Sequence, residues 1–261
     1  MNDNLILPLL LVTGGIVLLV IGWLKRSKSQ FFGTVPLRLT GGLMPDETQF
    51  ITGTAQSFVK VTAPASRREC VFYLEEVERL QSGYGRHGNS ARWVSEGYTP
   101  YGAFFLKDMD GGAFVLPGRL GLDLKTPRFS DNEDLLPGMA AAGAIRRTEQ
   151  IIPEGETVTV LGVPRPLSEL MRYLRSGQDF GLPADLVKRL ADMEKDPAYA
   201  RLPCFFGDGL RALTDRPHAE YVEGTAAAGA NYLQLGALLL AGGVAALLYM
   251  LKSSLPPSDP Y

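Results

Sequence analysis

Residues 5–24 read LILPLLLVTGGIVLLVIGWL, an uncharged run that ends at the basic cluster of Lys25, Arg26 and Lys28. A helix rises about 1.5 Å per residue, so this run forms a rod of about 30 Å, which matches the hydrocarbon core of a bilayer. Trp23 lies where an interfacial aromatic residue belongs. The alternative is a cleavable signal peptide, which has a basic start and small residues at its cleavage site. Because the chain starts with Met-Asn-Asp-Asn and the basic cluster follows the run, we expect a membrane anchor.

A second uncharged run occupies residues 230–251 and is also long enough to cross a bilayer. Lys and Arg close to a span tend to stay on the cytoplasmic side of the membrane. On the inner side of the two runs lie Lys25, Arg26, Lys28 and Arg216, against Lys252 alone on the outer side. We therefore expect an integral, two-pass protein with a cytoplasmic central domain and both termini outside, although Glu220 and Glu223 favour the opposite orientation for the second span.

Charge and cysteine content limit the classes of function. The chain has 26 basic and 28 acidic residues, a net charge of −2, which provides no basic surface for nucleic acid. Cys70 and Cys204 adjoin apolar residues and are interpreted as buried, with a disulfide in a periplasmic domain as the alternative. Because His87 and His218 are not near either cysteine in sequence, no zinc-binding pair exists, and we expect no metal and no cofactor.

The segment between the runs indicates a β-rich domain. Strand patterns rich in branched and aromatic residues occur at 50–57, 70–81, 103–107, 113–116 and 156–163. The turn residues at 108–112 predict a tight hairpin, and the glycine-rich segment 82–90 predicts the tip of another. Residues 29–42 are interpreted as a linker.

Two short amphipathic helices are predicted after the last strand. Apolar residues recur at helical spacing at Leu167, Leu170, Met171 and Leu174, and again at Leu186, Val187, Leu190 and Met193. Ser168 is expected to cap the first helix and Gly177 to end it. We expect both helices to pack on the sheet, with a membrane-surface position as the alternative.

The expected fold class is therefore α+β: a β-rich soluble domain of antiparallel hairpins with two short helices, between two transmembrane helices. The expected boundaries are 1–28 for the first anchor with its basic stop, 29–223 for the soluble domain with a helical elaboration at about 164–200, and 224–261 for the second anchor with a short tail.

The order of these segments resembles the GIDE domain, also called BAM for "beside a membrane". The resemblance covers most of the segment from Leu43 to Thr214 and both spans. It is carried by Gly42-Leu-Met-Pro45, Ile51-Thr-Gly-Thr-Ala55, Cys70-Val-Phe-Tyr73, Trp93, the hairpin Phe104 to Pro117 and Ile152-Pro-Glu-Gly-Glu-Thr-Val-Thr-Val-Leu-Gly162. This domain occurs in the MULAN/MAPL mitochondrial ubiquitin ligases and in many prokaryotic proteins. The resemblance implies a membrane-anchored interaction or sensing module.

The chain departs from the ligases in one respect. A RING finger follows the second span in those proteins and binds two zinc ions through eight Cys or His ligands. Residues 252–261 contain neither Cys nor His, so we expect no RING ligase chemistry. With short termini and no mitochondrial targeting pattern, a bacterial inner-membrane protein is expected.

Few residues suggest catalysis, and we expect no catalytic, cofactor-binding or metal-binding residues. A membrane-bound enzyme is the alternative, and it would use His87 and the carboxylates of Glu75, Glu76, Glu78 and Glu96. A solvated strand face and a surface histidine are the simpler interpretations. Asp108 and Asp110 resemble the start of a calcium loop, but position twelve is Arg119 instead of Glu.

Glycines suggest two further interactions. Gly83, Gly85 and Gly88 form a G-x-G-x-x-G pattern, which binds phosphate only between a strand and a helix, and strands flank it here. In the runs, Gly14, Gly15, Gly236, Gly242 and Gly243 permit close helix contact with the other span or with a second copy of the chain, or are simply tolerated. The expected partners are the lipid bilayer and an unknown protein.

Overall fold

A computed structural model describes residues 6–85, 88–118, 121–125, 129–130, 143–176 and 182–254, with the backbone alone for 82–85, 88–91 and 253–254. The chain forms two compact units. The first comprises Met1–Val35 with Ala219–Tyr261, and the second comprises Pro36–His218.

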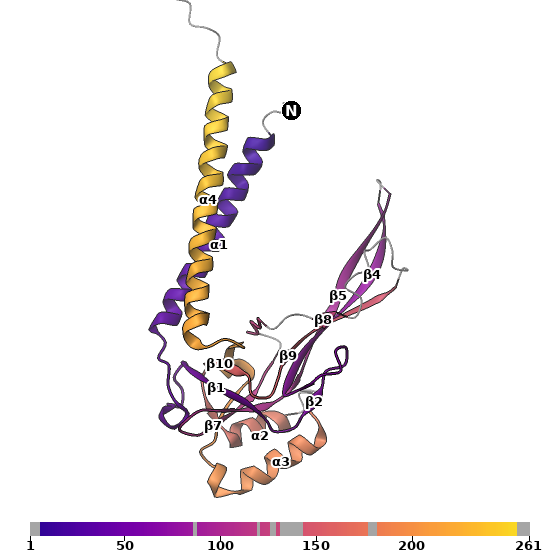
Figure 1. The fold of residues 1–261 in the computed structure, drawn as a ribbon, viewed down its shortest axis with the longest axis vertical. Helices are drawn as coiled ribbons and strands as arrows, with labels where there is room; N and C mark the ends of the chain where they lie inside the picture. The colour runs from indigo at the N-terminus through magenta and orange to yellow at the C-terminus, as the bar shows by residue number, and fades with distance from the viewer. Residues whose placement is uncertain are drawn as a thin grey trace, which may run out of the picture. The chain divides into compact units, whose positions relative to one another are not determined.

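The first unit is built from two long helices, α1 (Ile6–Thr34) and α4 (His218–Ser254). With 29 and 37 residues, they are about 43 and 55 Å long. Among the described residues, these two helices are long and apolar enough to cross a membrane by length and composition. They run antiparallel and side by side in Figure 1.

Glycines allow the two helices to approach closely. A Cβ placed on Gly15 would lie 2.7 Å from the backbone nitrogen of Leu240, and one on Gly236 would lie 2.9 Å from the carbonyl oxygen of Gly15. Gly22 and Gly243 are similarly crowded, by Leu233 and Val12 respectively. Gly14 and Gly242, in contrast, have no such neighbour within 4 Å. The two helices are therefore paired within one chain by Gly15, Gly22, Gly236 and Gly243.

The linker predicted at residues 29–42 is too long, because only residues 35–39 of that range lie outside a helix. Helix α1 continues to Thr34, and residues Thr40–Gly42 form a 3-10 turn, η2. Helix α4 likewise begins at His218, twelve positions before the apolar run at 230. The rings of Phe32 and Tyr221 lie 5.3 Å apart, so packing between the helices extends their ends beyond the apolar residues.

The second unit contains a seven-stranded sheet. Its strand order is β11 (Arg165–Pro166), β12 (Pro203–Phe206), β7 (Gly112–Leu116), β6 (Phe104–Lys107), β1 (Gln49–Ser57), β10 (Thr157–Gly162) and β13 (Leu210–Thr214). All neighbours are antiparallel except β12 and β7, which run parallel. The hairpin predicted around the turn at 108–112 is confirmed as β6 and β7.

A second sheet has the order β5 (Gly88–Gly102), β4 (Phe72–Gly85), β9 (Ile145–Ile152) and β8 (Phe129–Ser130). The pair β4 and β5 is the long hairpin that the glycine-rich segment predicts, and it is visible in Figure 1. A short pair, β2 (Val61–Thr62) and β3 (Glu69–Cys70), precedes it.

Alternating side chains divide the core between the two faces of the seven-stranded sheet. Phe104, Leu106 and Val115 lie in one cluster with Phe72 and Ile152 of the second sheet. The intervening residues of the same strands and of β12 face the other side, where Phe114, Cys204 and Phe206 lie. This alternation is the two-residue period of a strand that is buried on both faces.

The helices α2 (Leu167–Arg175) and α3 (Ala184–Lys195) cover that second face (Figure 1). Their predicted apolar positions contact the sheet, since Leu170, Met171 and Leu190 are buried in the same cluster. The predicted cap is wrong: Pro166 occupies the N-cap position, and Ser168 is the second residue of α2. Gly177 lies outside the described residues. The molecule thus has a mixed α/β fold with a β-rich body and two terminal helices.

Candidate interaction site

The carboxylates weighed as acid–base groups lie on the second sheet and are mostly paired with arginines. Glu78 is 2.6 Å from Arg146, Glu75 is 3.7 Å from Arg147, Glu96 is paired with Arg79, and Glu76 lies on β4 opposite Thr148. The side-chain hydrogen bond from Arg79 lowers the pKa of Glu96, which makes this carboxylate a poor proton donor near neutral pH. These ion pairs link neighbouring strands and support the interpretation of a charged strand face.

The glycine pattern does not form a phosphate loop. Gly83 and Gly85 lie on β4, Gly88 lies on β5, and Gly85 pairs directly with Gly88 across the hairpin. A strand therefore follows the pattern instead of a helix, as expected. His87 lies outside the described residues, so the enzyme alternative that relies on it has no described geometry.

Asp108 organises a turn. Its Oδ1 accepts hydrogen bonds from the backbone nitrogens of Asp110 and Gly111, at 2.9 and 3.0 Å. Its Oδ2 accepts from the backbone nitrogen and the hydroxyl of Thr40, at 2.6 and 2.7 Å. Oδ1 thus stabilises the β6–β7 turn itself and Oδ2 joins that turn to η2, which agrees with the turn interpretation.

Both cysteines are buried free thiols, as the apolar interpretation predicts. Cys70 lies with Val61, Ala63 and Ile151, whereas Cys204 lies in the cluster beneath α2 and α3. Burial raises the pKa of Cys70 to about 11, with a further contribution from the charge of Glu149, and raises the pKa of Cys204 to about 12. Neither thiol is poised to act as a nucleophile near neutral pH.

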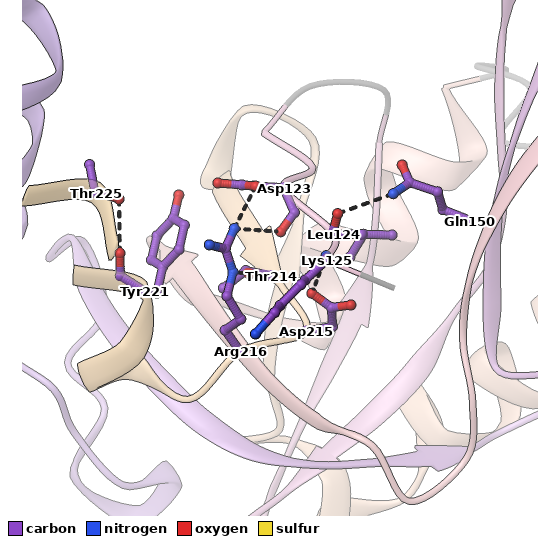
Figure 2. Close-up of polar contacts among 9 residues, drawn as sticks. All are labelled: Asp123, Leu124, Lys125, Gln150, Thr214, Asp215, Arg216, Tyr221 and Thr225. Carbon is purple, nitrogen blue, oxygen red and sulfur yellow. Dashed lines mark hydrogen bonds and ion pairs between the residues drawn. The ribbon is translucent and has the colours of Figure 1, made fainter. Parts of the chain in front are cut away.

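A polar cluster that the sequence did not reveal secures residues 121–125 to the end of β13, as Figure 2 shows. The guanidinium of Arg216 donates to Asp123 Oδ1 at 2.6 Å and to Thr214 Oγ1 at 3.1 Å. The backbone nitrogen of Lys125 donates to Asp215 Oδ1 at 2.6 Å. Because these polar groups bond to one another, we interpret the cluster as a structural clasp.

A pocket of about 380 Å³ is a candidate for ligand contact. We call it the proline–arginine pocket, because four prolines and two arginines line it together with Leu43, Ala200 and Leu202. The charged and cyclic residues are Pro45, Pro164, Arg165, Pro166, Arg201 and Pro203. Its volume falls within the range of ligand-binding pockets, and its lining combines apolar walls with a few polar groups.

Three separate segments build this pocket. Residues 43–45 precede β1, residues 164–166 form β11 and its approach, and residues 200–203 lead from the 3-10 turn η3 (Pro197–Tyr199) into β12. The pairing of Arg165 with Cys204 and of Pro166 with Pro203 brings two of the segments together. The sequence shows the prolines but carries no periodic signal that they converge.

Comparisons with known proteins add no assignment: no protein-family model, curated protein or solved structure matches the chain.

Proposed function

We propose that this chain is a two-pass integral membrane protein that presents a GIDE/BAM-like interaction or sensing domain at the membrane surface, without catalytic activity. The pairing of α1 with α4 is the observation that carries the proposal. Two apolar helices at opposite ends of the chain, packed antiparallel through Gly15 and Gly236, form the hairpin that a double anchor requires.

A contact between Lys25 of α1 and Tyr232 of α4 supports the same depth in the bilayer for both residues. The ammonium group of Lys25 lies 5.7 Å from the ring centre of Tyr232, so the basic stop of α1 and an aromatic residue of α4 lie at the same level. Lys and Tyr both favour the interface between lipid and water. In this arrangement the helix pair continues past Lys25 into water. Pro36–His218 is then the interaction domain that the two helices anchor.

The proposed location is the bacterial inner membrane, with Pro36–His218 in the cytoplasm. This topology is tested with three variants that lack Cys70 and Cys204 and have one new cysteine each. The new cysteine is placed after Met1, at Tyr261 or at the exposed Arg68. We expect a membrane-impermeant maleimide to label both termini, but not position 68, in intact cells. Labelling at position 68 would show that the orientation is the opposite one. Release of the protein from membranes by alkaline carbonate would refute the double anchor.

The interaction role is tested by crosslinking in native membranes. We expect the full-length protein to give at least one reproducible crosslinked protein species of defined mass, with residues of Pro36–His218 at the crosslink. A monomer with no enriched neighbour, from several crosslinker positions on this unit, would overturn the proposal.

A further inference from the structure

We propose that the proline–arginine pocket binds an extended segment of a partner protein, and that it recognises an acidic side chain next to an apolar one. This inference rests on the proposed role as an interaction domain and adds the surface and the chemistry of recognition.

The pocket is rigid and unsuited to the addition of a strand. Proline fixes its own φ angle, so the four prolines limit the conformations of the walls. Strand β11 is the outer strand of the seven-stranded sheet, and Pro166 leaves it without one backbone donor. A segment that docks here must therefore be recognised mainly through its side chains instead of by a ladder of backbone hydrogen bonds.

The charge of the pocket selects a carboxylate. Arg165 Nη2 lies 3.0 Å from Asp208 Oδ1, and its guanidinium lies 5.7 Å from the ring centre of Phe206, so this side chain is held in place. Arg201 is exposed and forms no ion pair with any residue that the structure describes. The guanidinium groups of Arg165 and Arg201 and the carboxylate of Asp208 together have a net positive charge. A planar guanidinium can bind a carboxylate through two parallel hydrogen bonds.

The apolar part of the pocket and its rim favour a protein as the partner. Leu43 and Leu202 line the pocket, and Met44 and Tyr199, chain neighbours of lining residues, are 45% and 38% exposed. Tyr, Met and Arg are enriched at the contact surfaces of proteins, where they provide area with adaptable contacts. The pocket can thus take one apolar side chain beside the carboxylate that Arg201 binds.

Defined peptides test the recognition chemistry with the full-length protein in lipid nanodiscs. The probes are fluorescent eight-residue peptides of Ser and Ala that carry a central Leu-Glu or Leu-Asp, with Leu-Gln and Leu-Asn versions as matched neutral peptides. We expect fluorescence polarisation to show carboxylate peptides binding about tenfold more tightly than their amide versions. Equal affinity for the charged and neutral peptides would overturn the proposal.

Variants locate the binding site. Arg201→Glu should remove the preference for carboxylate peptides, whereas Arg68→Glu, the same charge change on the exposed loop between β2 and β3, should leave it unchanged. Arg201→Lys keeps the charge without the planar guanidinium and should give an intermediate affinity. Ala200→Trp, at an exposed position, should fill the pocket and weaken all the peptides. Equal effects of Arg68→Glu and Arg201→Glu would show nonspecific electrostatic attraction and refute the site.

A photo-crosslinker separates this inference from the proposed function. Placed at Tyr199, it should capture a protein in native membranes, and the Leu-Glu peptide should block that capture while the Leu-Gln peptide does not. Capture from Arg68, or from Arg172 on the exposed side of α2, without capture from Tyr199 would refute the pocket but retain the interaction role. Absence of capture from all three positions would refute both.

Discussion

The carboxylate of Asp108 is hydrogen-bonded to both the backbone nitrogen and the hydroxyl of Thr40, at 2.6 and 2.7 Å. This contact joins residues that are 68 positions apart, and it fixes the start of the second unit onto the turn between β6 and β7. Burial disfavours the charged carboxylate, but the hydrogen bonds from Thr40, Asp110 and Gly111 outweigh it, and the pKa of Asp108 is lowered.

Asp108→Asn should destabilise the protein by about 1–3 kcal/mol, because an amide cannot accept these hydrogen bonds at both of its ends. A lowered pKa in the folded state adds stability above the unfolded value of about 3.9, and this contribution is lost as the pH falls through the folded pKa. The difference between wild type and variant should therefore narrow below about pH 4. Urea unfolding of the full chain in detergent from pH 3 to 7 measures both effects. Asp110→Asn is the matched control, since Asp110 contributes its backbone nitrogen to the turn.

Gly15→Leu should separate α1 from α4. A Cβ at this position would lie 2.7 Å from a backbone atom of Leu240, and backbone cannot yield as a side chain does. We expect a loss of about 1–3 kcal/mol or more, as for other overpacked sites. Gly14→Leu, one position away on the open face, is expected to be neutral. Thermal unfolding in detergent compares the two variants, and equal melting temperatures would contradict the glycine-mediated contact.

Arg146→Met should weaken the second sheet. The guanidinium lies 2.6 Å from Glu78 and 4.8 Å from the ring centre of Trp93, and the side chains of Arg146 and Glu78 are 24% and 17% exposed. Removal leaves a partly buried carboxylate without its partner, which should cost about 1–3 kcal/mol. Arg147→Met removes an ion pair with Glu75 that has a longer distance, 3.7 Å, and a more exposed arginine. It should lower the free energy of unfolding by less than about 1 kcal/mol. Urea unfolding, followed by tryptophan fluorescence, measures the free energy of unfolding of both variants. Equal losses would contradict this ranking.

Cys70 and Cys204 should resist alkylation in the folded protein. With a pKa of about 11 for Cys70 and about 12 for Cys204, at most about 1 thiol in 1,000 is ionised at pH 8, and burial restricts access further. Mass spectrometry after treatment with iodoacetamide should find no adduct on the native protein. Two adducts should form after unfolding without a reductant. A failure to react after unfolding would instead demonstrate a disulfide.

Local patterns predicted much of the fold because their signals lie within a few residues. The turn at Asp108 to Gly112 specified its hairpin through turn chemistry, and Leu170 with Leu190 marked the faces of two helices through their spacing. Both apolar runs became helices of sufficient length. The ends of elements were less predictable: α1 passes the expected stop to reach Thr34, because Phe32 packs on a residue far along the chain, Tyr221.

The sequence by itself determined the two apolar helices and the β-rich body between them, since each depends on composition or short-range period. Only the tertiary structure decided which partners meet. The pairing of Glu78 with Arg146 depends on the register of β4 with β9, and the meeting of Leu43, Arg165 and Arg201 depends on the edge of the seven-stranded sheet. These contacts join residues far apart in the chain, so they arise from the collective packing of the whole domain, which no local pattern encodes.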